Sequence, residues 1–331
     1  MCTISILVPI YGVETFIERC SRSLFEQTYS DLEYVFVDDC TPDRSIDVLK
    51  SVLKEYPQRE QCVKIIHHEK NRGLAATRNT CLDNASGEWV CIVDSDDWLE
   101  NHAIRNLFMK QRESDADMIL GSRCKHSVDS IVEIHYPNVD KNQRILLNLN
   151  GNYMPLTGCI IRKSLFDENA IRWLEGFNMA EDVRMVCLLT YFADKMVSCD
   201  DLIYHYDMTN SNSIMHEASD KNKAMQNTYE NLQNKLSILD FFSDKEEQYY
   251  DKAVEMTVRM LEVVLKQSLK RRNRRVFYEI VDLIDGNLKI ARKMRWERSG
   301  FKGFLNHSYT FSEMDYQWHR IIKHVVSQSK A

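Results

Sequence analysis

Short apolar runs alternate with helix-like segments along residues 4–120. Five runs have the length and composition of buried strands, at 4–8, 32–37, 63–66, 89–93 and 117–120. Between them, apolar residues recur every three or four positions, which predicts amphipathic helices at 13–25, 45–56, 74–85 and 103–108. Strands and helices that alternate at this spacing form parallel crossover units. We therefore predict an α/β, Rossmann-like fold with a mainly parallel sheet flanked by helices on both faces.

The pattern changes near residue 215, beyond which strand signals fade. Long amphipathic helices are predicted at 224–242, 249–268 and 276–294. We therefore predict two domains, an α/β domain at 1–215 and a smaller α-helical C-terminal module at 216–331.

Composition narrows the class of protein. The chain has 331 residues and a formal net charge of −6, so it is not a polycation and we expect no nucleic-acid partner. Its ten cysteines form no C-x-x-C pair, which argues against zinc spacing and is typical of a protein of the reducing cytosol. No apolar run approaches the about 20 residues of a membrane span, and no signal peptide is visible. We expect a cytoplasmic protein.

Acidic residues cluster where the predicted strand at 89–93 ends. Asp94, Asp96 and Asp97 place three mutually repelling carboxylates within four residues. A hard divalent cation, Mg²⁺ or Mn²⁺, would offset that repulsion and could share these ligands with substrate phosphates. The alternative is a helix N-cap, for which Asp97 alone would suffice. A calcium EF-hand does not fit, because the sixth position from Asp94 is Leu99 rather than Gly.

Two further groups lie at strand ends, where ligands of such sheets bind. Asp38 and Asp39 end the strand at 32–37, and Asp39 could accept a hydrogen bond from a nucleobase N–H. A polar turn that caps the next helix explains the same pair. Tyr11 follows the first strand and could stack on a nucleobase or simply pack.

Arg78 and the pair Glu181–Asp182 are candidates on predicted helices. Arg78 falls in the first turns of the helix after Gly73, near the positive end where phosphates bind. Its alternative is an ordinary surface position. Glu181 and Asp182 open another helical stretch, either as acids favoured by the helix dipole or, for Asp182, as a base that takes the proton of an attacking hydroxyl.

Taken together and in their order along the chain, these sequence motifs resemble those of family 2 glycosyltransferases of the GT-A fold. The resemblance extends from residue 4 to about residue 214. The matching segments are 5–11, 23–28, 37–39, 71–74, 76–79, 87–90, 94–97 and 181–182. The resemblance implies an inverting, metal-dependent transferase. It would move a hexose or N-acetylhexosamine from a nucleotide-diphosphate donor, a UDP-sugar, to a hydroxyl of a glycan or lipid-linked acceptor. Cell-surface polysaccharide synthesis is the process that the resemblance implies.

The resemblance also implies a role for single residues on the donor side. The uracil ring would contact the residues at the ends of the first two strands, and the phosphates would lie near the arginine of the helix at 74–85. The implied donor-binding residues are Pro9, Tyr11, Asp39, Arg78, Asp94 and Ser95.

Metal ligands and the catalytic base follow from the same resemblance. Asp94 and Asp96 belong to the family's D-x-D motif, in which Asp96 would ligate Mn²⁺ or Mg²⁺ and Asp94 would contact the ribose or the metal shell. Asp182 matches the base, with Glu181 beside it on the acceptor side. His205 lies where some members place a third metal ligand, although a histidine between two tyrosines is more often packed or hydrogen-bonded.

One loop departs from the family pattern. Many members have Gly-Ser after the paired acids of the second strand, where this chain has Cys40-Thr41. Cysteine in place of glycine could change the backbone conformation of the loop, and with it the choice of nucleotide.

The C-terminal module carries a basic stretch at 270–275. Further bases follow at Lys289, Arg292, Lys293, Arg295 and Arg298. Such a face could touch anionic lipid headgroups at the inner face of the membrane, at about 1 kcal/mol per basic residue, and would suit a lipid-linked acceptor. The alternative is a solvated helix face. Trp296, Phe301 and Phe304 would either anchor this region at the membrane or fill its core.

Two other classes of protein share parts of this pattern. A sugar-nucleotide pyrophosphorylase usually has a Gly-rich loop after its first strand, where this chain has only Gly12. A non-enzymatic protein on a decayed transferase fold would be expected to lose its acids, yet Asp39, Asp94, Asp96 and Asp182 are present. UDP binding with and without Mn²⁺ discriminates between these classes, because a pyrophosphorylase needs a nucleoside triphosphate and a binding protein shows no turnover.

Overall fold

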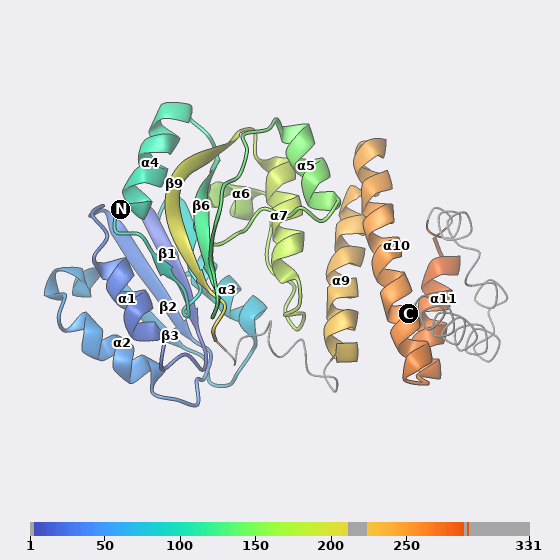
Figure 1. Cartoon of the computed structure of the whole chain (residues 1–331), viewed down its shortest axis with the longest axis horizontal. Helices are drawn as coiled ribbons and strands as arrows, with labels where there is room; N and C mark the ends of the chain where they lie inside the picture. The colour runs from blue at the N-terminus through green and yellow to red at the C-terminus, as the bar shows by residue number, and fades with distance from the viewer. Residues whose placement is uncertain (1–2, 211–223, 288–289, 291–331) are drawn as a thin grey trace. The chain divides into compact units, whose positions relative to one another are not determined.

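The computed structural model describes residues 3–210, 224–287 and 290 (Figure 1). The chain divides into two compact units, Met1–Glu217 and Ala218–Ala331. The predicted domain boundary at residue 215 lies outside the described residues. Within the described ranges, no helix combines the length and the apolar character needed to cross a membrane.

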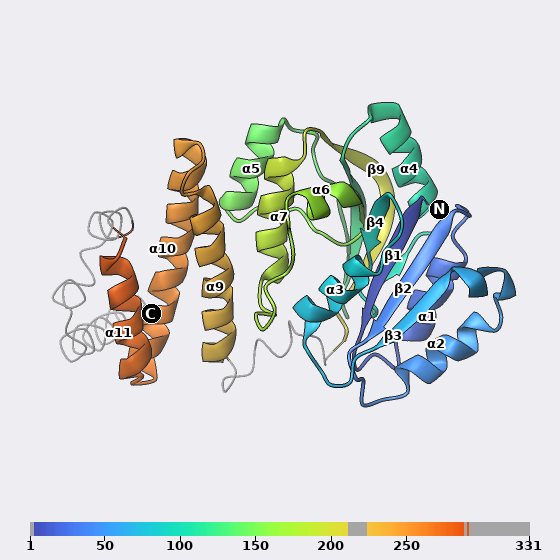
Figure 2. The ribbon, with the colours of Figure 1, turned by 180° about the vertical axis from the view of Figure 1, so that it is seen from behind.

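A nine-stranded sheet forms the centre of the first unit (Figures 1 and 2). Its strand order is β3-β2-β1-β4-β8-β6-β9-β5, with β7 beside β6. The strands are β1 Ile4–Ile10, β2 Leu32–Asp38, β3 Val63–His67, β4 Trp89–Ile92, β5 Trp98–Leu99, β6 Met118–His126, β7 Ile131–Ile134, β8 Cys159–Arg162 and β9 Met196–Asp207. Strands β1 to β4 are parallel, as the alternation of strands and helices predicts.

The other half of the sheet is mixed. β8 runs antiparallel to β4 and β6, β9 runs parallel to β6, and β5 runs antiparallel to β9. The α/β fold with flanking helices is confirmed, but the sheet as a whole is mixed rather than mainly parallel. The sequence signals for the added strands are weak, because β8 has four residues and β9 contains Asp200 and Asp201 in its middle.

Helices cover both faces of this sheet. They are α1 Ile17–Phe25, α2 Ser45–Leu53, α3 Leu74–Asp83, α4 Ala103–Ser114, α5 Lys141–Leu149, α6 Lys163–Glu168 and α7 Glu181–Phe192, with a 3-10 helix η1 at Pro57–Cys62. Alternate β1 residues Ile4, Ile6 and Val8 pack into one core with α1, α2 and α4. Helix α3 contacts β1 and β2 but adds nothing to that core, so it covers the opposite face.

The described part of the second unit is helical. It comprises α9 Ala224–Phe242, α10 Glu247–Lys270 and α11 Arg274–Asp285. α10 contacts both other helices. Their shared core includes Phe242, Leu261 and Phe277, each fully or almost fully buried. The predicted helices at 224–242 and 249–268 match α9 and α10, whereas α11 ends before the predicted limit at 294.

The loop after β2 keeps a glycine-like backbone despite Cys40. Cys40 has φ +57°, in the left-handed region that favours glycine. The next residue fixes this turn, because the Thr41 amide donates to Asp38 Oδ1 at 2.8 Å and Thr41 Oγ1 accepts from the Gly12 amide at 2.8 Å. Cys40 therefore holds a backbone conformation that glycine would adopt at lower cost.

We expect Cys40→Gly to raise the free energy of unfolding by about 0.5–1 kcal/mol. The left-handed conformation costs a non-glycine residue about 1–2 kcal/mol, and the larger unfolded-state entropy of glycine offsets part of the gain. Urea unfolding measures the difference. Cys40→Ala is the matched control, because it removes the exposed thiol but keeps the Cβ. Equal stability of the two variants would contradict the argument.

Candidate functional site

The predicted site residues gather where β1, β2 and β4 end. These strands are parallel and adjacent, so the loops after Ile10, Asp38 and Ile92 leave the sheet at one edge. Helix α3 begins after Gly73 near this edge, because the Arg72 and Gly73 amides contact Asp39. Sequence order alone indicated this edge, and the structure brings these loops together there.

Asp39 holds the entrance to α3. It is 2% exposed, and its carboxylate accepts hydrogen bonds from the amides of Arg72 and Gly73, both at 2.8 Å. His68 Nδ1 lies 2.7 Å from Asp39 Oδ1. Gly73 has φ +85°, and a Cβ there would lie 2.7 Å from the Asn178 amide. Asp39 therefore positions the loop 71–73, while its contact with a nucleobase stays a prediction.

Pro9 and Tyr11 differ in accessibility. Pro9 is buried within β1 and pairs in register with Val37, so it contributes to the sheet. Tyr11 is 51% exposed just beyond the strand. An exposed aromatic ring at this edge has room to stack on a planar ligand.

Arg78 joins three acids from two distant parts of the chain. Its side chain is 3% exposed and forms ion pairs with Asp94 at 2.7 Å, Glu181 at 2.7 Å and Asp182 at 2.6 Å. Arg78 Nε is buried and has no hydrogen-bond partner among the described residues. The predicted phosphate contact of Arg78 stays a prediction, since in this structure the guanidinium faces carboxylates.

The two acids of α7 have different surroundings. The Glu181 side chain is 10% exposed, whereas that of Asp182 is 36% exposed. Burial, and then the charge of Asp182, raises the pKa of Glu181 to about 8. Burial also raises the pKa of Asp182, and the nearby Arg78 opposes that increase. Burial therefore disfavours the charged form of Glu181, and Asp182 is the more accessible of the two carboxyl groups.

The start of α7 is strained. Ala180, its N-cap, has φ +58°, a conformation that side chains with a Cβ rarely adopt. Such strain persists only where the surroundings impose it, and it concentrates at functional sites. At this position, the strained residue comes directly before Glu181 and Asp182, which contact Arg78.

The four residues 94–97 after β4 alternate between partly exposed and buried side chains. Asp94 and Asp96 are partly exposed, whereas Ser95 and Asp97 are buried. Burial, and then the charge of Asp94, raises the pKa of Asp96 to about 6. Asp97 is not a helix cap, because strand β5 follows it. Its carboxylate accepts hydrogen bonds from the Tyr204 hydroxyl at 2.5 Å and the Asp207 amide at 2.8 Å.

Three further residues, Asn210, Arg19 and Asp207, hold this loop. The Asn210 amide donates to Asp96 Oδ2 at 2.9 Å. Arg19 bonds both the Asp96 carbonyl at 3.1 Å and Asp207 at 2.5 Å.

The contacts that the ring nitrogens of His205 make are with Glu100 and His126. Its Nε2 is 2.7 Å from Glu100 Oε1, and its Nδ1 is 2.9 Å from His126 Nε2. Among the described residues, its ligand atoms cluster with those of Cys124 and His126, and no such cluster joins it to Asp94 and Asp96. The prediction of His205 as their partner in a metal site therefore finds no support in these contacts.

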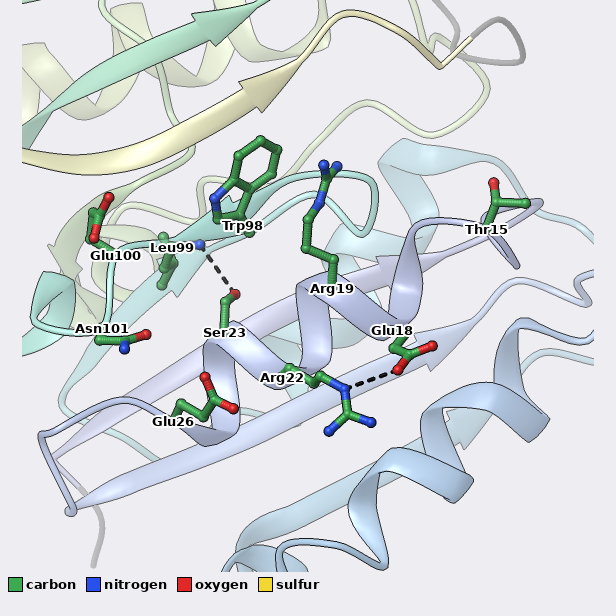
Figure 3. Close-up of a pocket in the computed structure, with 10 residues that line it drawn as sticks. All are labelled: Thr15, Glu18, Arg19, Arg22, Ser23, Glu26, Trp98, Leu99, Glu100 and Asn101. Carbon is green, nitrogen blue, oxygen red and sulfur yellow. Dashed lines mark hydrogen bonds and ion pairs between the residues drawn. The ribbon is translucent and has the colours of Figure 1, made fainter.

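A cleft of about 560 Å³ lies between α1 and the segment 98–101 (Figure 3). Its lining includes Arg19 and Trp98, whose side chains lie together, with the guanidinium carbon 3.7 Å from the ring centroid. Glu100 stands on the same wall. None of the predicted site residues lines this cleft, so it is separate from the Arg78 cluster.

Comparison with known proteins identifies the first unit. Residues 5–169 match the family model described as glycosyl transferase family 2. The chain belongs to glycosyltransferase family 2. This family 2 chain is 40% identical over 212 residues to the putative glycosyltransferase EpsH of Bacillus subtilis (strain 168). The aligned stretch covers 61% of this chain and 60% of EpsH. The stretches that align with two other curated glycosyltransferases cover only 16% and 35% of the length of those proteins.

Solved structures confirm the fold. The family 2 chain resembles Staphylococcus aureus TarS 1–349 in complex with UDP-GlcNAc, with a TM-score of 0.71 and 20% identity, over 99% of this chain and 92% of that one. The mannosyltransferase PcManGT of Pyrobaculum calidifontis, in complex with GDP-Man and Mn²⁺, has a TM-score of 0.56 and 12% identity, over 96% of this chain and 86% of that one.

Proposed function

We propose that this chain is an inverting, metal-dependent glycosyltransferase that uses a UDP-sugar and glycosylates a hydroxyl of a glycan or lipid-linked saccharide. The observation that carries the proposal is the Arg78 cluster. One buried guanidinium joins Asp94, from the loop after β4, to Glu181 and Asp182, from the start of α7. The cluster therefore holds a donor-side acid and an acceptor-side base in fixed relation.

The donor side has the chemistry that a hard divalent cation requires. Asp94 and Asp96 offer carboxylate oxygens, and the raised pKa of Asp96 reflects burial and negative charge that a cation would offset. Bound Mn²⁺ or Mg²⁺ would supply positive charge to the diphosphate leaving group. Asn210 and Arg19 hold Asp96 in place, and the exposed Tyr11 ring is available for the nucleobase.

The acceptor side requires one base. Asp182 is the more accessible acid of the pair, and its raised pKa makes it a stronger base than an ordinary aspartate. The neighbouring Glu181 is more buried, and its contact with Arg78 keeps it on the inner side of the pair. A single displacement, in which Asp182 takes the proton of the attacking hydroxyl, inverts the anomeric centre and needs no enzyme nucleophile.

The second unit carries exposed basic residues that could bind a membrane surface, where a lipid-linked acceptor would be located. Lys270, Arg271, Arg272, Arg274 and Arg275 are exposed around the turn between α10 and α11. We propose that this basic turn contacts anionic lipid headgroups at the inner face of the membrane, as a lipid-linked acceptor would require. The further bases Lys289, Arg292, Lys293, Arg295 and Arg298 and the aromatic residues Trp296, Phe301 and Phe304 lie outside the described residues.

UDP release from a panel of UDP-sugars, with Mn²⁺ or with EDTA, tests the function. Slow hydrolysis by water needs no acceptor, so the assay can precede knowledge of the acceptor. We expect metal-dependent release from one or two sugars, which would also identify the donor. Absence of both release and UDP binding would contradict the proposal, and turnover of a nucleoside triphosphate with a sugar phosphate would indicate a pyrophosphorylase.

Asp96→Ala is expected to weaken Mn²⁺-dependent UDP binding by at least about 10–100-fold, since loss of even an outer-shell partner costs a metal site that much. Isothermal titration calorimetry with and without Mn²⁺ measures the change. The matched control is Asp83→Ala, which removes an exposed carboxylate paired with Arg172 on the outside of α3. Unchanged Mn²⁺-dependent affinity in Asp96→Ala would show that Asp96 is not a ligand.

A further inference from the structure

Strands β6 and β9 bring three soft metal ligands together away from the Arg78 cluster. Their parallel register pairs Cys124 with His205, and His126 lies two residues beyond Cys124 on the same face of β6. The ligand atoms of these three side chains all lie within 4.8 Å of one another. Cys124 is 3% exposed and His205 is 8% exposed, whereas His126 is partly exposed.

Hydrogen bonding prepares His205 to bind an ion through one nitrogen. Glu100 Oε1 lies 2.7 Å from His205 Nε2 and accepts its proton in a hydrogen bond. The Nδ1 lone pair then faces His126 Nε2 at 2.9 Å. A carboxylate that holds the far N–H of a histidine in this way is the usual outer-shell partner of a metal-bound imidazole. Trp98 stacks on His205 at 4.8 Å with an interplanar angle of 2°, which fixes the ring plane.

We propose that Cys124, His126 and His205 bind a divalent transition-metal ion of the zinc class, with Glu100 orienting His205. Two nitrogens that share a tetrahedral Zn²⁺ at about 2.0–2.1 Å are roughly 3.4 Å apart, so the histidines need to separate by about half an ångström and turn until both nitrogens point at the ion. The site is distinct from the carboxylates proposed for Mn²⁺ or Mg²⁺, because thiolate and imidazole ligands favour softer ions. It does not depend on the proposed transferase function.

Binding involves defined proton movements. The Cys124 thiol releases its proton to solvent as the sulfur–metal bond forms. In the ion-free pair, neutral His126 carries its single proton on Nε2 and donates it to His205 Nδ1. When the ion binds Nε2, that proton moves through water to Nδ1 of the same ring, so His126 stays neutral. The proposed site borders the cleft of Figure 3, since Trp98 and Glu100, which contact His205, belong to the lining of that cleft. Water or the carboxylate of Glu133, which is opposite Cys124 on β7, is available as the fourth ligand.

Such an ion would act on the neighbouring loop. It would join β6 to β9 immediately before Asp207, whose amide holds Asp97 and whose carboxylate pairs with Arg19. The same contacts fix the position of Asp96 through its carbonyl. The ion would therefore stabilise the position of the loop 94–97 through Asp207 and Arg19, without contacting the donor.

Titration of the full chain with Co²⁺ tests the proposal through absorption rather than activity. We expect one equivalent to produce a thiolate-to-cobalt charge-transfer band that Zn²⁺ removes by displacement. Cys124→Ser should abolish the band. Cys62→Ser, which changes a half-buried thiol at the end of η1, and Asp96→Ala should both retain it. Absence of the band in the wild type, or its persistence in Cys124→Ser, would overturn the proposal.

A second variant keeps the test decisive if Cys124→Ser folds poorly. Glu100 is exposed, and Glu100→Gln is expected to weaken Co²⁺ binding by about 10–100-fold while retaining the band at saturation. Glu26→Gln is the matched control, because Glu26 lines the same cleft but pairs with Tyr56. Equal Co²⁺ affinity of the two variants would overturn the role of Glu100 as the residue that orients His205.

Discussion

Replacing Asp182 by Asn is expected to lower kcat for sugar transfer by about 10²–10⁴-fold, the usual contribution of a general base. Asparagine keeps the shape of the side chain but cannot accept the proton of the attacking hydroxyl. The donor side should be untouched, because Arg78 keeps its contacts with Asp94 and Glu181. Mn²⁺-dependent UDP affinity is therefore expected to equal that of the wild type.

Steady-state kinetics with the donor found in the UDP-sugar panel, together with calorimetry of UDP binding, measures both quantities. Glu175→Gln is the matched control, since Glu175 is an exposed acid that pairs with Arg72 close to the same loop. The control should keep wild-type kcat. Full activity of Asp182→Asn would show that the base assignment is wrong, and loss of UDP binding would show that Asp182 acts by positioning the donor side.

The local chemistry of the chain accounts for the parts of the fold that were predicted. Strands β1 to β4 are short apolar runs with clear helices between them, so spacing alone indicates their parallel order. β9 was not predicted, because Asp200 and Asp201 interrupt its apolar pattern and its stability comes from pairing with β6. A pairing of this kind depends on residues far apart in the chain, and no local pattern records it.

The candidate site shows the same division. Asp94, Asp96, Asp182 and Arg78 could be named from motifs, since each motif is local. The contacts of Arg78 with the acids of α7 depend on how α7 packs near α3. Arg78 and Asp182 are separated by 104 residues along the chain, so no local pattern predicts this contact. For the same reason, the sequence did not indicate that the register of β9 with β6 places His205 beside Cys124.

Removing the charge of Arg78 is expected to have the largest effect on stability. Arg78→Met keeps similar bulk but leaves Asp94, Glu181 and Asp182 without the cation that contacts them. Loss of one partner from a buried ionic cluster costs about 3–5 kcal/mol, because the remaining charges stay desolvated. Arg72→Met is the matched control, since the pair of Arg72 with Glu175 is exposed and is expected to contribute at most about 1 kcal/mol.

The stability deficit of Arg78→Met should also grow with pH. Burial raises the folded-state pKa of Asp182 above its unfolded value and Arg78 opposes that increase, so loss of Arg78 raises this pKa further. A raised folded-state pKa gives stability that is present below the unfolded pKa and is lost as pH rises through the folded pKa. Urea unfolding at about pH 5 and about pH 8 should therefore show a larger difference from wild type at the higher pH. A deficit that is equal at both pH values, or no larger than that of Arg72→Met, would mean that the three carboxylates do not depend on Arg78 for their burial.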